Sequence, residues 1–236
     1  MTVLLVLFTL ILFLVFDHAV QKYRTRSVLS SREEKAGERV LVQRPIYVPN
    51  DVSLATNHTW MKQNQDETIT IGFDELLSRL VGAIEKVSLP QVGEAVVPAV
   101  ADIAVGVRGR TLRLALPLSG SVVDVNPDVL KNPSLLLSDP YGKGWLMRVK
   151  ARADDVEKSR QFVVRWPIEW LSEQVALVRD FIVMNSQQGQ AVMLQEGGLL
   201  AEGVLQQFDE SVWKDFSRTF VGLHRTKDTE TKEIRS

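Results

Sequence analysis

Residues that could perform chemistry are few in this chain, and their spacing argues against most catalytic sites. There is no cysteine, so disulfides, thiolate catalysis and cysteine-based metal sites are excluded. The three histidines, His18, His58 and His224, are scattered, and no His-Glu-x-x-His spacing occurs. We find neither a catalytic triad nor a glycine-rich phosphate loop. We therefore expect no catalytic residue, no metal ligand and no cofactor.

The most distinctive polar cluster lies between two segments that alternate apolar and polar residues. The stretch 101–126 predicts a β-hairpin whose tip is Gly-Val-Arg-Gly-Arg, residues 106–110. Glycines at such a tip supply positive φ. The arginines either contact a protein partner or lipid, or form only a solvated face. The candidate partner-binding residues are Arg108, Gly109, Arg110 and Arg113.

Residues 106–109 also match the Gly-x-x-Gly loop of KH nucleic-acid-binding modules. A KH module needs a helix after this loop, whereas residues 111–118 alternate as a strand and contain Pro117. The formal net charge of −1 gives no reason to expect a polyanionic partner. Nucleic acid binding is therefore kept only as a third interpretation.

The elements that must position this hairpin are mostly short strands separated by glycine and proline. The 236 residues, 45% hydrophobic and 24% charged, suit one globular domain with extra segments. The pattern predicts a mainly β domain with helical additions, an α+β chain. The expected order is a strand over 67–72, a helix capped by Asp74 and stopped by Gly82, strands within 83–90, 92–107 and 111–126, a short helical turn, and a last strand over 145–150.

The N-terminus predicts a membrane anchor. Residues 2–16 are almost wholly apolar and, with the next four residues, approach the length of a transmembrane helix. A secretory signal peptide would need basic residues before this run and a cleavage site after it, and a buried core helix is the other alternative. Every nearby lysine and arginine follows the run, so the positive-inside rule predicts a single-pass protein whose C-terminal domain is cytoplasmic.

Two helices are expected in the C-terminal third. The first begins at Pro167 and carries a broad apolar face, which the β domain or another chain must cover. The second is capped by Asp209 and places Trp213, Phe216 and Phe220 on one side. The predicted organisation is an anchor over 1–22, a juxtamembrane linker over 23–56, a β domain over 57–152, a helical extension over 153–223 and a disordered tail over 224–236.

A series of motifs, in order, resembles the glycine cleavage system H protein family. The matching segments are His58-Thr59-Trp60, Ile71-Gly72, Val87-x-Leu89-Pro90, Val92-Gly93, Pro117-x-Ser119-Gly120, Val123-x-Val125-Asn126, Asn132-Pro133 and Asp139-Pro140-Tyr141-Gly142-x-Gly144-Trp145. The resemblance covers roughly residues 57–150. It implies a lipoyl-domain-like barrel-sandwich hybrid of two small sheets.

The resemblance also implies a role for the hairpin tip. In the family the tip reads roughly Glu-Ser-Val-Lys-Ala, and its lysine carries lipoate. Counted from Gly93, that lysine falls on Gly109 and the glutamate falls on Gly106. Glycine offers no amine, and arginine is no substitute acceptor. Together with the predicted anchor, the missing lysine favours a membrane-tethered, non-lipoylated binding or scaffold module that is not an enzyme, with a true lipoyl-type group carrier, as the resemblance implies, as the alternative.

Overall fold

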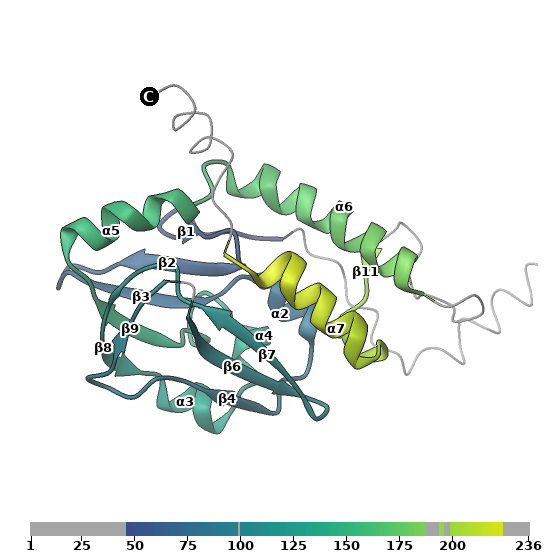
Figure 1. Ribbon diagram of the computed structural model, residues 1–236, viewed down its shortest axis with the longest axis horizontal. Coiled ribbons are helices and arrows are strands. Elements are labelled where there is room, and N and C mark those ends of the chain that lie inside the picture. The colour runs from purple at the N-terminus through teal and green to yellow at the C-terminus, as the bar shows by residue number, and fades with distance from the viewer. Residues whose placement is uncertain (1–45, 99, 187–193, 196–198, 224–236) are drawn as a thin grey trace, which may run out of the picture. The chain divides into compact units, whose positions relative to one another are not determined.

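The computed structural model describes residues 46–98, 100–186, 194–195 and 199–223. They belong to one compact unit in which two β-sheets and several helices share a hydrophobic core (Figure 1). The predicted sheet-rich architecture with helical additions is thereby confirmed.

The larger sheet has six strands in the order β1-β2-β3-β9-β8-β5, and every neighbouring pair is antiparallel. All six residues of β3 are buried, as expected for a strand covered on both faces. The strand bounds are β1 Ser53–Leu54, β2 Thr59–Gln63, β3 Thr68–Phe73, β5 Ala95–Val96, β8 Gly120–Val125 and β9 Met147–Lys150.

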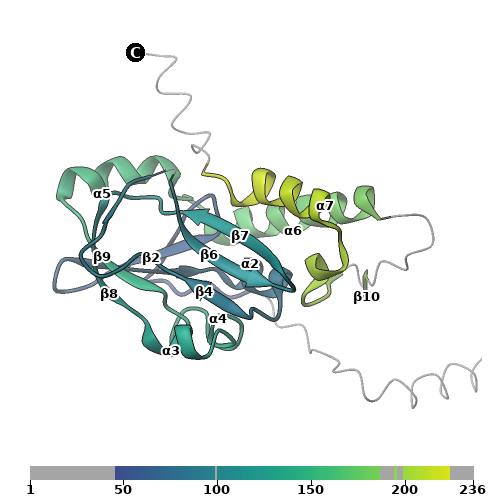
Figure 2. The ribbon, with the colours of Figure 1, turned by 60° about the horizontal axis from the view of Figure 1, so that its bottom comes forward.

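The smaller sheet carries the predicted hairpin. Its strands, in the order β4-β6-β7, are β4 Lys86–Ser88, β6 Ala101–Val107 and β7 Arg110–Ala115. Side chains from its inner face, such as Val105 and Leu112, join the same core as Ile71 of β3. The two sheets therefore enclose one apolar interior, and the β6–β7 hairpin forms part of its wall (Figure 2).

Helices occupy the connections and the C-terminal third. Their bounds are α2 Glu75–Val81, α3 Pro127–Lys131, α4 Leu135–Ser138, α5 Ala153–Ser159, α6 Pro167–Asn185 and α7 Glu210–Phe216. Shorter turns are η1 Arg160–Phe162, η2 Val204–Gln207 and η3 Ser217–Val221, the last being a π-helix. A small hairpin, β10 Leu194–Gln195 with β11 Leu199–Leu200, separates α6 from η2, so the extension is not wholly helical as predicted.

The predicted helix boundaries are confirmed by their caps. The carboxylate of Asp74 accepts a hydrogen bond from the Leu77 N–H at 2.8 Å, and α2 ends at Gly82 with φ +70°. Pro167 is the first residue of α6. The carboxylate of Asp209 accepts from the Ser211 and Val212 N–H groups at the start of α7.

The boundary between linker and domain lies earlier than the sequence predicted. β1 begins at Ser53, within the range 23–56 that was assigned to the linker, because it pairs with β2 through Ser53↔Met61 and Leu54↔Trp60. Two residues cannot show a recognisable strand period, so this edge strand carries no sequence signal of its own.

The predicted border at residue 152 does not separate two independent parts. The backbone of Val164 donates to Leu54 O at 2.8 Å, and Thr56 donates to Phe162 O at 2.9 Å. Phe181 of α6 packs edge-on against Phe216 and Phe220, and these aromatic rings belong to the core of the β domain. The helical extension therefore shares its hydrophobic core with the β domain and is part of the same folded unit.

The predicted anchor, the N-terminal part of the linker and the predicted tail lie outside the described residues. Among the helices that the structure describes, none combines the length and the apolar character needed to span a bilayer.

Candidate functional site

The hairpin tip is a two-residue turn between β6 and β7. Val107 pairs with Arg110, and the two residues between them, Arg108 and Gly109, have φ of +47° and +75°. Positive φ at both central positions is what a type I′ hairpin turn requires. A Cβ added to Gly109 would meet nothing within 4 Å, so the apex of the turn faces open space.

The four candidate residues do not form one surface. Side chains alternate between the two faces of a strand, so Arg110 points to the same side as buried Leu112 and Leu114, whereas Arg113 points to the opposite, exposed side. Arg108 and Gly109 are exposed at the apex. The tip and the outer face of the sheet therefore carry Arg108 and Arg113, without Arg110.

Arg110 contacts the C-terminal extension. Its Nη1 donates to Gln206 O at 3.3 Å, and its guanidinium carbon lies 5.8 Å from the ring centroid of Trp213. Hydrogen bonds from Ser211 and Val212 hold the pKa of the Asp209 carboxyl below its usual range, and Arg110 adds a smaller attraction. Arg110 thus makes intramolecular contacts that neither predicted role, a partner contact or a solvated face, had included.

The same extension covers the C-terminal end of α2, next to the hairpin. Gly203 N–H donates to Arg79 O at 2.7 Å, and Gln206 Nε2 donates to Val81 O at 2.8 Å, so two helix-end carbonyls gain partners. A Cβ on Gly82 would lie 2.6 Å from Gly203 Cα. Gly82 is therefore required both for the positive φ that ends α2 and for this close approach of two backbone segments.

Removal of the Arg110 side chain tests this assignment. We expect Arg110→Ala to lower the free energy of unfolding by about 1 kcal/mol, because a part-buried hydrogen bond and a cation–π contact are lost. Arg108→Ala should change it by less than about 0.5 kcal/mol, because Arg108 is exposed. Urea unfolding of the purified variants measures both; equal effects would contradict the separation of the two arginines.

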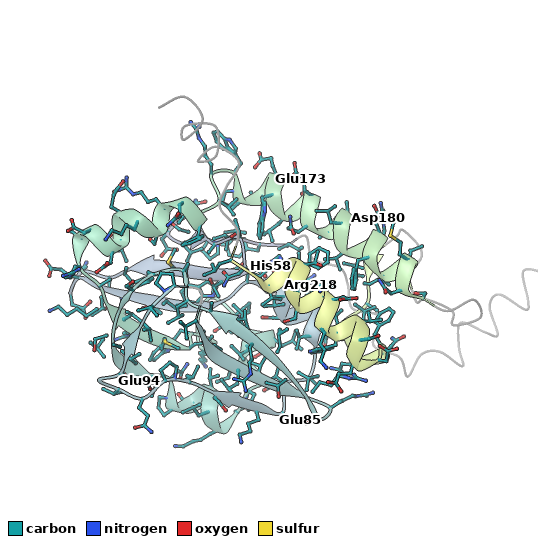
Figure 3. All side chains as sticks on the ribbon, in the orientation of Figure 1. His58, Glu85, Glu94, Glu173, Asp180 and Arg218 are labelled. Atoms are coloured by element: carbon teal, nitrogen blue, oxygen red, sulfur yellow. The ribbon has the colours of Figure 1, made fainter. Side chains whose placement is uncertain are left out.

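One buried ionisable pair lies away from the hairpin. His58, which is labelled in Figure 3, has its Nδ1 2.7 Å from Asp74 Oδ2, and both side chains are 0% exposed. The ring of Trp170 lies 4.9 Å from that of His58. His58 Nε2 has no hydrogen-bond partner among the described residues. Because solvent and substrate cannot reach the pair, we assign it to the packing of α6 on the β domain rather than to catalysis.

The motif Asp139–Trp145 forms a structural turn. Asp139 accepts from the Lys143 N–H at 2.8 Å, and Trp60 Nε1 donates to Pro140 O at 3.1 Å. Burial raises the pKa of Tyr141 far above its ordinary value. The phenol therefore stays protonated at neutral pH, and Trp60, Tyr141 and Trp145 pack in or against the hydrophobic core.

The geometry can be compared with that of a KH module and with that of a metal site. The Gly-x-x-Gly of residues 106–109 is followed by strand β7, so the helix that a KH module requires is not there. Within the described part of the chain, no three histidine, aspartate or glutamate residues are grouped so that they could hold a metal ion.

Comparison with known proteins identifies relatives of this domain. The family model "Glycine cleavage H-protein" matches residues 52–166. A glycine cleavage system H protein of Pseudoalteromonas atlantica is 43% identical over 112 residues, which cover 47% of this chain and 86% of that protein. One from Mycobacterium tuberculosis is 32% identical over 109 residues, 46% of this chain and 81% of that protein. The crystal structure of the Mycobacterium marinum H protein covers 48% of this chain and 98% of its own, with 28% identity and a TM-score of 0.41.

The two sheets and the exposed turn define a small β module that presents a hairpin apex. The similarity covers most of the length of these relatives, and the chain therefore belongs to the glycine cleavage H-protein family. The family match ends at Trp166, one residue before α6 begins.

The residues that contact the hairpin from the C-terminal extension were not predicted from the sequence. Gln206 and Trp213 are separated from Arg110 by about a hundred residues and have no local feature that indicates this contact. One signal was available: Arg110 is two residues before Leu112, so strand alternation alone places it on the inner face.

Proposed function

We propose that this protein is a membrane-tethered, non-lipoylated H-protein-like module that binds or scaffolds partner proteins. The observation that carries the proposal is Gly109, which stands at the apex of the exposed turn where the resemblance implies the lipoyl lysine. The chain has no lysine between Lys86 and Lys131, so no shift in register along the hairpin supplies the missing amine.

Arg108 and Arg113 remain as candidate partner contacts. Both are exposed, and neither forms an ion pair with another described residue. Because Arg110 is held by Gln206 and Trp213, a partner that docks at the tip would meet Arg108 at the apex and Arg113 on the outer sheet face. The alternative, a lipoyl-type group carrier, lacks an attachment point on this hairpin.

The tether is proposed from sequence alone. Residues 2–16 are apolar, and the basic residues follow them, which favours insertion with the domain on the cytoplasmic side. No metal and no cofactor is part of the proposal.

One preparation tests both parts of the proposal. Native membranes are washed with high salt and with carbonate, and the protein is then solubilised and its intact mass measured. We expect the protein in the washed pellet, because an inserted apolar segment resists both treatments, and a mass equal to that of the sequence without lipoate. Protease added to the cytoplasmic side should digest the domain.

Each part can fail separately. Release by salt alone would exclude an inserted anchor, and protection from protease on the cytoplasmic side would reverse the orientation. A lipoyl adduct on the native chain would overturn the non-carrier function. Proteins that remain bound after gentle solubilisation, and are lost from an Arg108→Glu/Arg113→Glu variant, would identify the partner at the tip.

A further inference from the structure

The smaller sheet has an outer face that is open to solvent. Val87, Val105 and Leu112 are buried in the core, so the residues that alternate with them along each strand point outward. Residues directly opposite each other on neighbouring strands share a face, which arranges the outward residues in two rows. The outer sheet face consists of Lys86, Gly106 and Thr111 in one row and Ser88, Ala104 and Arg113 in the next.

Two cations stand at opposite corners of this face. Lys86 lies on β4 in the first row and Arg113 on β7 in the second, while Ser88 and Thr111 place hydroxyl groups at the other two corners, and all four residues are exposed. None of the six residues of the face is acidic. Glu85, which is labelled in Figure 3, precedes β4, and neither cation forms an ion pair with it or with any other described residue. The positive charges of the face are therefore not paired within the described part of the chain.

The middle strand places no long side chain between the two cations. Gly106 lies opposite Lys86, and Ala104 lies opposite Arg113. A Cβ added to Gly106 would have its nearest neighbour, the Cβ of Lys86, at 3.5 Å, which is an ordinary contact. Since neighbouring strands lie about 4.8 Å apart, β4 and β7 are about 10 Å apart across β6. Side chains of a partner therefore have room to reach both cations from above β6.

The donors of the outer sheet face suit carboxylates better than phosphate. Phosphate sites commonly use backbone N–H groups at a helix N-terminus or in a turn. Here β6 pairs with β4 and β7 on its two sides, so its N–H groups are used within the sheet. A guanidinium pairs with a carboxylate through two parallel hydrogen bonds, and an ammonium and two hydroxyls add further donors. The net charge of −1 gives no long-range attraction to nucleic acid or to an anionic bilayer.

We propose that the outer sheet face binds an acidic segment of a partner protein, whose carboxylates pair with Lys86 and Arg113. Charge complementarity carries the inference, because two exposed cations lack partners and Gly106 leaves the position opposite Lys86 free for a carboxylate from another chain. The inference rests on the proposed function, since it names the chemistry of the partner that the hairpin sheet binds.

Two labelled peptides provide the probe. One alternates glutamate and serine, and the matched peptide has glutamine in place of glutamate. Fluorescence anisotropy with the full chain in mild detergent, at low salt, should show the glutamate peptide binding about tenfold more tightly than the glutamine peptide. Lys86→Ala/Arg113→Ala should remove this preference. Gly106→Glu should also remove it, because the new carboxylate faces Lys86 within the sheet, whereas Gly106→Gln adds a side chain of similar size without charge and should keep it.

A charge-matched control separates the outer sheet face from the overall charge. Lys150 and Lys158 are exposed and lie outside the smaller sheet, so Lys150→Ala/Lys158→Ala changes the net charge equally and should leave the preference as it is. Circular dichroism checks that each variant is folded, as expected for exposed positions. The inference is overturned if neither peptide binds, if both bind equally, or if the control variant loses the preference as the face variant does. It is also overturned if a labelled single-stranded oligonucleotide binds more tightly than the glutamate peptide through the same two cations.

Failure of the inference and failure of the proposed function give different results. If a native partner is lost from the Arg108→Glu/Arg113→Glu variant but the chain shows no preference for glutamate, the acidic chemistry is wrong and the proposed function stands. A lipoyl adduct on the native chain would overturn the proposed function even if the glutamate peptide binds as expected.

Discussion

The double replacement Gly106→Glu/Gly109→Lys is expected to make the hairpin a substrate for a lipoate ligase, whereas the native chain stays unmodified. A lysine at residue 109 supplies the amine, and the resemblance implies that the ligase also recognises an acidic residue three positions earlier. Gly106 lies directly opposite Lys86 across the sheet, and a Cβ added there makes only ordinary contacts, the nearest at 3.5 Å. The new carboxylate therefore fits and faces a positive charge.

The lysine itself fits less easily. Gly109 has φ +75°, a conformation that costs a residue with a side chain roughly 1–2 kcal/mol. The apex is open, so strain rather than a clash is the only structural cost at this position. We expect Gly109→Lys alone to be modified poorly, because Gly106 leaves the acidic recognition residue missing and the exposed Arg108 adds a positive charge next to the site.

Incubation with a lipoate ligase, ATP and lipoate, followed by intact mass measurement, reads out the result. Gly106→Glu/Gly109→Arg is the matched control, because it has the same charge and the same backbone strain but no primary amine. If only Gly106→Glu/Gly109→Lys is modified, the hairpin has kept the shape that the ligase recognises, and the native chain lacks only the residues needed for attachment of lipoate. Equal labelling of lysine and arginine variants would place the adduct elsewhere, and an unmodified lysine variant would show that the hairpin has lost the shape that the ligase reads.

The second large effect concerns the extension. Phe216→Ala is expected to lower the free energy of unfolding of the whole domain by about 3–5 kcal/mol. The ring is completely buried, so its removal loses apolar contacts and leaves a cavity in the core. Phe216 stacks on Phe220 with ring centroids 5.0 Å apart and meets Phe181 of α6 at 5.9 Å. Loss of the Phe216 ring therefore weakens the packing of both α6 and α7.

Urea unfolding monitored by circular dichroism measures this change. Leu177→Ala is the control, because Leu177 is 53% exposed on α6 and its removal should cost less than about 0.5 kcal/mol. If the β domain kept its unfolding midpoint in the Phe216→Ala protein while only a small helical signal was lost, the extension would be an independent appendage and the shared core would be wrong.

The sequence predicted local features well, because these depend on neighbouring residues. Asp74 and Gly82 define the ends of α2 through a side-chain cap and a positive φ, and Pro167 and Asp209 start α6 and α7 for similar reasons. The hairpin turn at Arg108 and Gly109 was visible from the alternation on both sides of it.

The arrangement of the C-terminal third could not be predicted in the same way. Which face of β7 the extension covers depends on contacts between residues about a hundred positions apart, such as Arg110 with Gln206. The predicted apolar face of α6 also proved to be two faces: Leu171, Val178 and Ile182 are buried, whereas Ile168 and Leu177 are exposed. A periodicity shows that a helix has an apolar side, but not how much of it the rest of the chain covers.

The pairing of α2 and β7 with η2 and η3 has a consequence for synthesis of the chain on the ribosome. The segment with family resemblance is complete at Trp166, yet the residues that cover α2 and β7 lie between Val204 and Val221. At 5–20 residues per second, the intervening stretch of about 55 residues takes roughly 3–11 s to translate. During that interval the nascent β domain displays the apolar surface that Val204, Leu205 and Phe216 later bury, so a chaperone that binds nascent chains has its opportunity there, before the last helix emerges.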